Sequence, residues 1–545
     1  MHEDVHDVIQ IGYGPVSEAL ALMLGQQGRK VAVVERWSER YPLPRAVCVD
    51  HELYRVLSAL GMSEALPSVT QPGPLYQWFN ADWKELLVID WSAPSISGGP
   101  EVNFVHQPTL EEALHEAVAR ERSVDLRLGW EFVDATQDDD LVRVELRNVE
   151  SGEKTILFTR FLVGCDGANS LVRAAIGGEH EDRGFEADWL VVDVLLKDGV
   201  TIEKLGIPAA GQYCNPERPT TIVPAGVREG RTFRRWEFMR LPGESIAELE
   251  REEAVWKLLH RWAGPDDIEL VRHKVYNFRS LMASRWRDRR ILIAGDAAHV
   301  MPPFMGQGMC AGMRDAWNLQ WKIGLILDGK ADQRLLDTYQ AERQPHVAQI
   351  TDISIYLGKI ICIPDPADAA RRDAAFLAGT ADPPPPFPSL SDGLIRKTAN
   401  GDPARTAGLL TPHVTVERSG KSMRLDDVVQ GRFALHCRGF DFEKTVRPDI
   451  QRKLDALNVC VVHYAKGSAG AVRDLDGAMD DFFESQGCAA FLSRPDFYAY
   501  GAADSAAAVE ELLTQFLADA AAAGIIVPTA ASPRLSAADL TQQSI

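Results

Sequence analysis

A glycine-rich turn near the N-terminus has the spacing of a phosphate-binding loop. Gly12 and Gly14 allow a tight turn and let the backbone approach a pyrophosphate, whose charge would lie at the start of the helix beginning near Pro15. Ser17 replaces the usual third glycine and slightly loosens helix–strand packing. Glu35 ends the next strand, where a carboxylate can accept hydrogen bonds from ribose hydroxyls. This order predicts a dinucleotide site, with a purely structural turn as the alternative.

Two short aspartate motifs lie far from this turn in the chain. Asp166 lies in Gly-Cys-Asp-Gly-Ala-Asn-Ser, residues 164–170, and Asp296 lies in Ala-Gly-Asp-Ala-Ala-His, residues 294–299. A short apolar run precedes each motif, which predicts a strand leading into it. A single Asp-Gly pair alone indicates no more than a turn. His299, the histidine that ends the Asp296 motif, is expected to be packed and hydrogen-bonded rather than catalytic.

A loop rich in proline and glycine follows Asp296. Residues 301–309 have the sequence Met-Pro-Pro-Phe-Met-Gly-Gln-Gly-Met, and a helix is predicted after them. Such a loop delivers backbone N–H groups and a helix N-terminus to one point, which stabilises negative charge. Gly308 and Met309 are therefore good candidates to lie beside an anionic group of a ligand. The alternative is a buried structural loop.

The elements that must position these motifs follow from the hydrophobic pattern. A strand at 8–11, a helix at 15–27 and a strand at 30–35 form a β-α-β unit of about 30 residues. Residues 188–280 have period-two runs, which predict an antiparallel sheet. After residue 296 the chain is predicted to be helical.

In this order the motifs resemble those of the FAD-dependent aromatic hydroxylases, the single-component flavoprotein monooxygenases. The resemblance covers residues 5 to about 360, and Arg-Trp-Glu-Phe at 235–238 resembles the branch that hydroxylates 3-(3-hydroxyphenyl)propionate. It implies that Asp166 lies near the pyrophosphate and that Asp296 reaches the ribityl chain. The residues expected to bind FAD are Gly12, Gly14, Pro15, Ser17, Glu35, Arg36, Arg45, Gln107, Asp166, Asp296, Pro303, Gly306, Gln307, Gly308 and Met309.

The resemblance also implies an activity. Members of the family hydroxylate a phenolic ring with NADH or NADPH and O2, through a C4a-hydroperoxyflavin. Arg45, Arg235 and Tyr276 are the candidate catalytic residues, and a plain ion pair is the alternative for Arg235. His273 and Arg279 are weaker candidates for the pocket, and no residue is nominated as the base. The sequence has one dinucleotide fingerprint, so the nicotinamide cofactor is expected to visit without a domain of its own.

Two other functions stay open. The same flavin chemistry could act on a pyridine, a polyketide or an antibiotic, because the substrate sheet is the hardest part to interpret. A protein of another class would be a non-catalytic scaffold that binds FAD. Flavin-dependent halogenation is disfavoured, since the sequence has no Trp-x-Trp-x-Ile motif.

The expected fold is α/β, with a Rossmann-like FAD-binding domain, an inserted antiparallel-sheet substrate domain and a thioredoxin-like C-terminal domain. The last lacks Cys-x-x-Cys and is expected to serve packing or dimer contact, which would make a homodimer. The predicted segments are the FAD-binding domain at 1–182 and 285–380, the substrate sheet at 183–284, a linker at 381–407, the C-terminal domain at 408–530 and a tail at 531–545.

Composition limits the partners. A net charge of −20 argues against nucleic acid, because phosphate binding needs clustered Lys and Arg. The eight cysteines are scattered without metal-site spacing, which favours a reducing cytoplasm and no metal. The acidic N-terminus argues against a signal peptide, and no apolar run is long enough to span a membrane. The expected partners are a small aromatic substrate and O2.

Overall fold

The protein is described from a computed structural model, which covers residues 5–464 and 471–528. The predicted tail at 531–545 lies outside the described residues. The chain divides into two compact units, of which the second combines residues 321–342 with residues 389–545 and the first holds the rest. The C-terminal unit therefore includes a helical stretch that the sequence pattern places in the second FAD-binding segment.

A mainly parallel sheet organises the first unit. Its strands are, in order, β17 (Arg287–Asp288), β18 (Ile291–Ile293), β11 (Lys154–Gly164), β1 (Val5–Ile11), β2 (Val31–Glu35) and β8 (Val124–Leu128), with β10 (Val142–Asn148) and β9 (Trp130–Gln137) added antiparallel. β1 pairs in parallel with β2 and β11, and β11 pairs in parallel with β18. The carboxyl ends of three adjacent strands therefore carry the three motifs.

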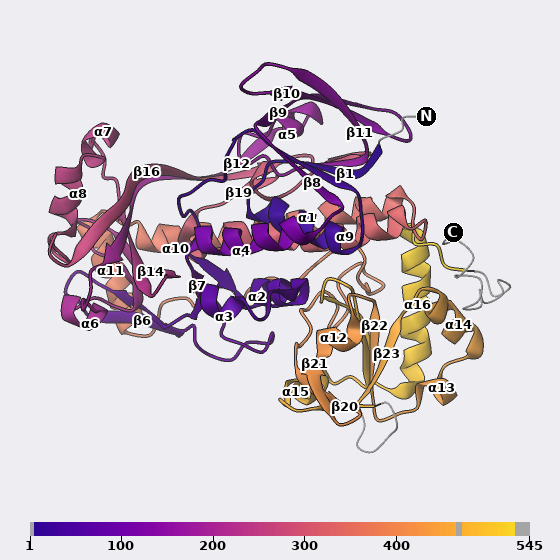
Figure 1. Ribbon diagram of the computed structural model, residues 1–545. Helices are drawn as coiled ribbons and strands as arrows, with labels where there is room; N and C mark the ends of the chain where they lie inside the picture. Colours follow the sequence, from indigo (N-terminus) through magenta and orange to yellow (C-terminus); the bar gives the residue numbers. More distant parts are fainter. Residues whose placement is uncertain (1–4, 465–470, 529–545) are drawn as a thin grey trace. The chain divides into compact units, whose positions relative to one another are not determined.

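Local sequence explains the first β-α-β unit. The residues of β1 and β2 are mostly apolar and mostly buried, as in parallel sheets covered by helices. α1 (Pro15–Gln26) begins with proline, whose fixed φ suits the first helical position. α4 (Gln107–Arg120) packs against α1, and the two helices lie side by side in Figure 1.

An antiparallel sheet forms the second layer. Its strands are, in order, β19 (His299–Val300), β16 (Ile268–Ala283), β12 (His180–Leu196), β15 (Arg231–Met239), β14 (Thr220–Arg228), β13 (Ala210–Tyr213), β5 (Leu75–Phe79) and β6 (Glu85–Asp90). β12 and β16 form the long ribbon that leads to α7 (Ile246–Leu249) and α8 (Glu252–Leu259) in Figure 1. The sheet also includes β5 and β6, which lie in the segment 1–182 predicted as FAD-binding domain and not in the predicted substrate sheet at 183–284.

Helices and small elements complete the first unit. The remaining long helices are α9 (Gly308–Leu327), α10 (Asp337–Ile361) and α11 (Pro366–Leu377), and the first two include residues of the second unit. The smaller elements are β3 (Cys48–Asp50), β4 (Thr70–Pro72), β7 (Val102–Val105), α2 (His51–Leu57), α3 (Leu66–Val69), α5 (Leu171–Ala175) and α6 (Ile202–Leu205). Among described residues no single helix is long and apolar enough to cross a membrane, although the pair 333–361 and 366–377, bent by 112°, passes that test together.

The second unit is built on its own seven-stranded sheet. Its strands are, in order, β21 (Lys421–Arg424), β20 (Thr415–Arg418), β24 (Val472–Asp474), β23 (Cys460–Tyr464), β22 (Ala434–Arg438), β25 (Ala490–Ser493) and β26 (Ala499–Ala503). β22 and β23 are parallel, whereas β25 and β26 are antiparallel. Its helices are α12 (Leu425–Val429), α13 (Phe442–Thr445), α14 (Pro448–Ala456), α15 (Ala478–Gln486) and α16 (Val509–Ala522).

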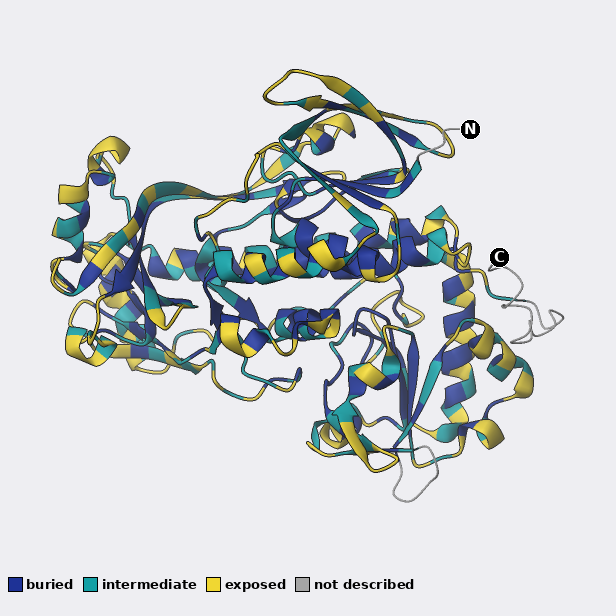
Figure 2. Cartoon of the chain, in the orientation of Figure 1, coloured by how far each residue is buried: buried dark blue, intermediate teal, exposed yellow. Residues whose placement is uncertain are grey.

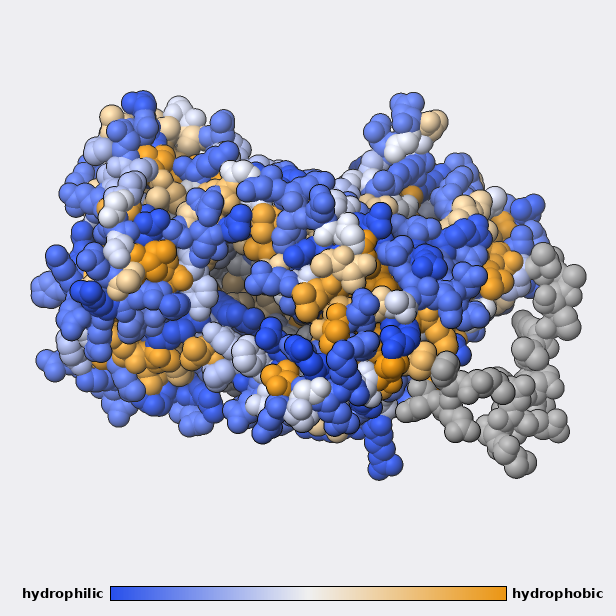
Figure 3. All heavy atoms as spheres, turned by 90° about the horizontal axis from the view of Figure 1, so that it is seen from above, coloured by the Kyte–Doolittle hydropathy of each residue, from blue (hydrophilic) through white to orange (hydrophobic). Residues whose placement is uncertain are grey.

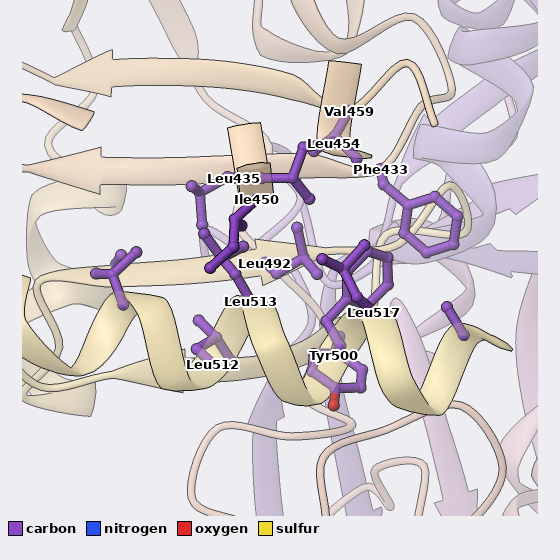
Figure 4. Packing of buried hydrophobic residues seen from close by; sticks show 14 of the residues in the cluster. Phe433, Leu435, Ile450, Leu454, Val459, Leu492, Tyr500, Leu512, Leu513 and Leu517 are labelled. Atoms are coloured by element: carbon purple, nitrogen blue, oxygen red, sulfur yellow. The ribbon is translucent and has the colours of Figure 1, made fainter. Parts of the chain in front are cut away.

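The core of this unit lies between the sheet and α16. Leu512, Leu513 and Leu517 project from the helix toward Leu435 and Leu492 of the strands (Figure 4). The same helix is buried along one side and exposed along the other (Figure 2).

The face of the whole molecule seen in Figure 3 is covered mostly by hydrophilic side chains and is hollowed near its centre.

Candidate functional site

The first and second motifs touch through their backbones. Gly12 has φ +97°, a conformation that side chains of L-residues rarely adopt. A Cβ atom there would lie 2.8 Å from the carbonyl carbon of Cys165 and overlap its oxygen. The N–H of Cys165 donates to the carbonyl of Ile11 at 2.7 Å, which holds the two segments together. Only glycine fits at this point.

The third motif joins the same surface. A Cβ on Gly312 of α9 would lie 2.6 Å from Cγ2 of Val16 and 3.0 Å from Cα of Gly295. The N–H of Ala294 donates to the carbonyl of Gly164 at 2.9 Å. The three motifs therefore form one continuous surface at the carboxyl edge of β1, β11 and β18.

Arg45 lies over the glycine turn. Its Nη2 is 3.7 Å from the position that a Cβ on Gly14 would take, at the start of α1. The helix N-terminus and the guanidinium together provide positive charge for a phosphate group. Gln107 holds the backbone of this loop, since its Oε1 accepts from the N–H groups of Arg45 at 2.8 Å and Ala46 at 2.5 Å.

Two other residues expected to bind FAD have side chains that already contact other parts of the protein. The carboxylate of Glu35 accepts from the N–H groups of Tyr13 at 2.8 Å and Trp37 at 3.0 Å. Arg36 places its guanidinium 5.1 Å from the ring centre of Trp37. Both residues therefore lie at the end of β2, where a ribose would bind.

Asp166 and Asp296 differ in their surroundings. Asp166 accepts from the Ser170 hydroxyl at 2.5 Å and the N–H of Leu171 at 2.8 Å, so it orders the turn before α5. The Asp296 side chain is exposed although the residues beside it are buried. Desolvation by the surrounding protein nevertheless raises the pKa of Asp296. An accessible carboxylate in such a recess suits hydrogen bonding to a polyol chain.

A buried ionic network supports the third motif. Asp315 of α9 accepts from Nε2 of His299 at 2.7 Å, Nε of Arg343 at 2.9 Å and the N–H of Gly295 at 3.1 Å. Burial alone would raise the pKa of Asp315, but His299 and Arg343 outweigh it and hold the pKa below its ordinary value. His299 is packed and hydrogen-bonded, as the sequence predicts.

The loop at 301–309 is fixed at both ends. The Ser354 hydroxyl donates to the carbonyl of Pro302 at 2.6 Å, and a short helical turn spans Pro303–Met305. Gln307 accepts from Arg314 at 3.0 Å, so its side chain is already engaged. α9 begins at Gly308, and a Cβ there would meet nothing within 4 Å. The start of α9 therefore faces open space at Gly308, and Met309 beside it is partly buried.

Phe304 of this loop meets an aromatic face of the antiparallel sheet. Its ring makes edge-on contacts with Phe185, Trp189 and Phe278, with centroids 5.6, 5.7 and 6.4 Å away. Such edge-to-face contacts are favourable for aromatic rings. Trp189 is fully buried in this apolar cluster, whereas Phe185 and Phe278 are only partly buried.

Arg235 and Tyr276 meet in a buried polar cluster. Asp193 of β12 pairs with Nε of Arg235 at 2.7 Å and with Arg272 at 2.5 Å, and Arg272 donates to the Tyr276 hydroxyl at 2.9 Å. Arg235 also donates to the backbone carbonyl of Arg45 at 2.7 Å. Arg235 therefore has an ion pair and also ties the sheet to the Arg45 loop.

The two weaker candidates lie elsewhere on β16. Side chains alternate along a strand, which puts His273 and Arg279 on the face opposite Tyr276. Sequence analysis did not identify Asp193, Arg272 or Glu18. Glu18 is fully buried beside Glu111, and burial raises its pKa well above the ordinary value. A charged residue within the apolar run of α1 was the available signal.

These observations fit FAD. A glycine turn at a helix start, a cationic side chain above it, an accessible Asp296 and the open start of α9 follow one another across one surface. Within the described part of the chain, no group of three or more His, Cys, Asp or Glu side chains could hold a metal ion.

Sequence comparisons agree with this site. Residues 5–354 match the family described as "FAD binding domain", and residues 408–519 match "HcaD C-terminal domain". A protein of Rhodococcus jostii (strain RHA1), named "Probable NADH-specific resorcinol 4-hydroxylase", is 37% identical over 94% of both chains. A "3-(3-hydroxy-phenyl)propionate/3-hydroxycinnamic acid hydroxylase" of Comamonas testosteroni is 33% identical over 77% of this chain and 71% of its own.

Solved structures share the fold. The flavin-dependent monooxygenase PieE, in complex with FAD and substrate, superposes with a TM-score of 0.78 at 21% identity, covering 95% of this chain and 99% of its own. Aklavinone-11 hydroxylase, with FAD and aklavinone, gives a TM-score of 0.75 at 23% identity with the same coverage. The mixed α/β architecture is therefore that of FAD-dependent monooxygenases.

Proposed function

The chain belongs to the FAD-dependent aromatic hydroxylase family, and on this premise we propose that it hydroxylates a phenolic ring, using NADH or NADPH and O2. One observation carries the proposal: the loop that begins α9 also presents Phe304 to the aromatic face of the antiparallel sheet. A ring held on that face would lie beside the start of α9. The NADH-specific name of the Rhodococcus relative favours NADH.

The chain's own residues have distinct roles in this reaction. When bound, FAD supplies the hydride-accepting and oxygen-activating chemistry. Arg45 and the start of α1 would hold its pyrophosphate, Asp296 its ribityl chain, and the start of α9 its pyrimidine edge. Phe278 and Phe304, backed by the fully buried Trp189, would orient the substrate ring and exclude water. Arg235 would position the Arg45 loop through its hydrogen bond to that backbone.

The substrate class rests on the curated relatives. Both are named for phenolic substrates, and the apolar face at Phe304 suits such rings. A pyridine, a polyketide or an antibiotic as substrate, and a scaffold without turnover, are the alternative outcomes of the test below.

Finer features belong to the same proposal. We propose that the parallel sheet is Rossmann-like and that the C-terminal unit is thioredoxin-like, which the parallel β22–β23 pair beside antiparallel β25 and β26 supports. That unit would serve packing or contact in a homodimer.

Its cysteines form no Cys-x-x-Cys pair, and all eight cysteines of the chain are free, which favours the cytoplasm. The predicted segment boundaries stay part of this proposal.

A substrate screen tests the proposal. Purified, FAD-loaded protein is mixed with NADH or NADPH and with phenols, pyridines or larger aromatics, and cofactor oxidation is followed with product mass. We expect phenols to stimulate oxidation and to gain one oxygen atom. A protein that no aromatic compound stimulates would be a scaffold, and product from pyridines or polyketides alone would replace the phenolic assignment.

A further inference from the structure

Glu237 lies on the sheet face that carries the aromatic residues. Along β15, Trp236 and Phe238 belong to the core on the other side of the sheet. Side chains alternate along a strand, so Glu237 shares its face with Arg235 and Met239. Met239 packs against the cluster that contains Trp189 and Phe304. A carboxylate is therefore placed at the margin of the apolar face.

The Glu237 carboxylate has no hydrogen-bond donor in the described part of the chain. Its nearest cation is Nη1 of Arg235 at 3.8 Å, beyond hydrogen-bonding distance, and Arg235 donates to Asp193 instead. The side chain of Glu237 is 11% exposed, so a small molecule can still reach it. A nearly buried carboxylate without a donor is costly, and a ligand hydroxyl would relieve that cost.

The other polar groups of this face already have partners. Gln212 of β13 donates to the Tyr76 hydroxyl at 2.7 Å and accepts from the Thr221 hydroxyl at 2.8 Å. Asp193 accepts from both Arg235 and Arg272. Among these groups, Glu237 is the one whose acceptor oxygens are left for a ligand.

We propose that Glu237 accepts a hydrogen bond from the ring hydroxyl of a neutral phenol and takes its proton, an inference that rests on the proposed function. The phenol O–H bond breaks and an O–H bond forms on the carboxylate of Glu237. The electron pair stays on the phenol oxygen and raises electron density at the ortho and para ring carbons. No further reactant is needed for this step.

Local charge supports both the base and the choice of a neutral substrate. Burial raises the pKa of Glu237 above its ordinary value, with Arg235 and Arg272 opposing and Asp193 adding to the effect. This shift brings the pKa of the Glu237 carboxyl group closer to the pKa of a phenol, which makes the carboxylate a stronger base. Both arginines are already paired, so a substrate carboxylate would add repulsion beside Glu237.

The test compares Glu237→Gln with a matched control, Glu269→Gln. Glu269 lies on β16 of the same sheet, with its side chain 61% exposed beside Arg231. In oxidised holoenzyme, difference spectra report whether bound 4-nitrophenol is ionised, and resorcinol hydroxylation reports turnover. We expect ionised probe in the wild type and the control. Glu237→Gln should hold neutral probe and hydroxylate on the order of 100-fold more slowly, with unchanged FAD content.

Several results would overturn the inference. Ionised probe and wild-type turnover in Glu237→Gln would remove the role of Glu237 as base. If Glu237→Gln folds poorly, Glu237→Asp keeps the carboxylate and should still ionise the probe, so neutral probe there would also refute the assignment. Binding of 3-(3-hydroxyphenyl)propionate more tightly than resorcinol would refute the neutral substrate. Wild-type holoenzyme that neither binds nor hydroxylates any phenol would refute the proposed function itself.

Discussion

Replacing Gly12 by alanine tests how the first two motifs form a cofactor cradle. At φ +97° a non-glycine residue costs about 1–2 kcal/mol. The new Cβ would also lie 2.8 Å from the carbonyl carbon of Cys165, and overpacking of this kind costs roughly 1–3 kcal/mol. The apoprotein can relieve both the backbone strain and the steric clash by separating the glycine turn from β11. FAD binding must bring the turn and β11 together again. A total of about 3 kcal/mol corresponds to a loss of FAD affinity on the order of 100-fold.

The assay titrates FAD into apoprotein and follows the quenching of flavin fluorescence. Gly28→Ala is the matched control, because Gly28 has φ +72° but a Cβ there would meet nothing within 4 Å. We expect that variant to lose about 1–2 kcal/mol of stability from the left-handed backbone conformation and to bind FAD like the wild type. Wild-type FAD affinity in Gly12→Ala would show that close contact between the motifs does not shape the site.

Two further substitutions probe the second unit and the α9 loop. Glu342 is buried between Lys322 at 2.6 Å and Arg494 at 2.7 Å, so Glu342→Gln should lower the free energy of unfolding by about 3–5 kcal/mol at pH 7 in urea denaturation. Burial opposes ionisation of Glu342, but Arg494 and Lys322 outweigh it and lower the pKa of Glu342 from 4.5 to about 2. The stabilisation that the ionised carboxylate provides is therefore complete above pH 4.5 and is lost as the pH falls toward 2. Equal acid sensitivity of the wild type and the variant would contradict this assignment. Gly306→Ala would put a Cβ 2.5 Å from Sγ of Cys48, so the variant should melt at a lower temperature and adding Cys48→Ala should recover part of the loss. Identical melting of the single and double variants would exclude that clash.

The sequence predicts the features that depend on local pattern. The β-α-β unit, the carboxyl-edge position of Asp166 and Asp296, and the helix after the 301–309 loop follow from short apolar runs and glycine spacing. His299, the last residue of the Asp296 motif, is packed, as expected. These features could be predicted because each depends on residues close together in the chain.

Features that depend on distant pairing escaped the sequence analysis. β5 joins the antiparallel sheet by pairing in parallel with β13, which no local pattern encodes. The ion pairs of Asp193 join three strands, and each strand alone shows only a charged residue among apolar ones. The role proposed for Glu237 likewise depends on Arg235 donating to Asp193 rather than to Glu237. Side-chain partners across a sheet become visible only when the register is known.

The central claim is that three distant segments make one FAD cradle, and the flavin content of the purified protein tests it most directly. Absorbance of protein freshly purified under native conditions, followed by release and quantification of the cofactor, gives the molar ratio of FAD to chain. We expect a yellow protein with about one FAD per chain, restored after removal by adding FAD. A colourless protein that takes up no added FAD would contradict it.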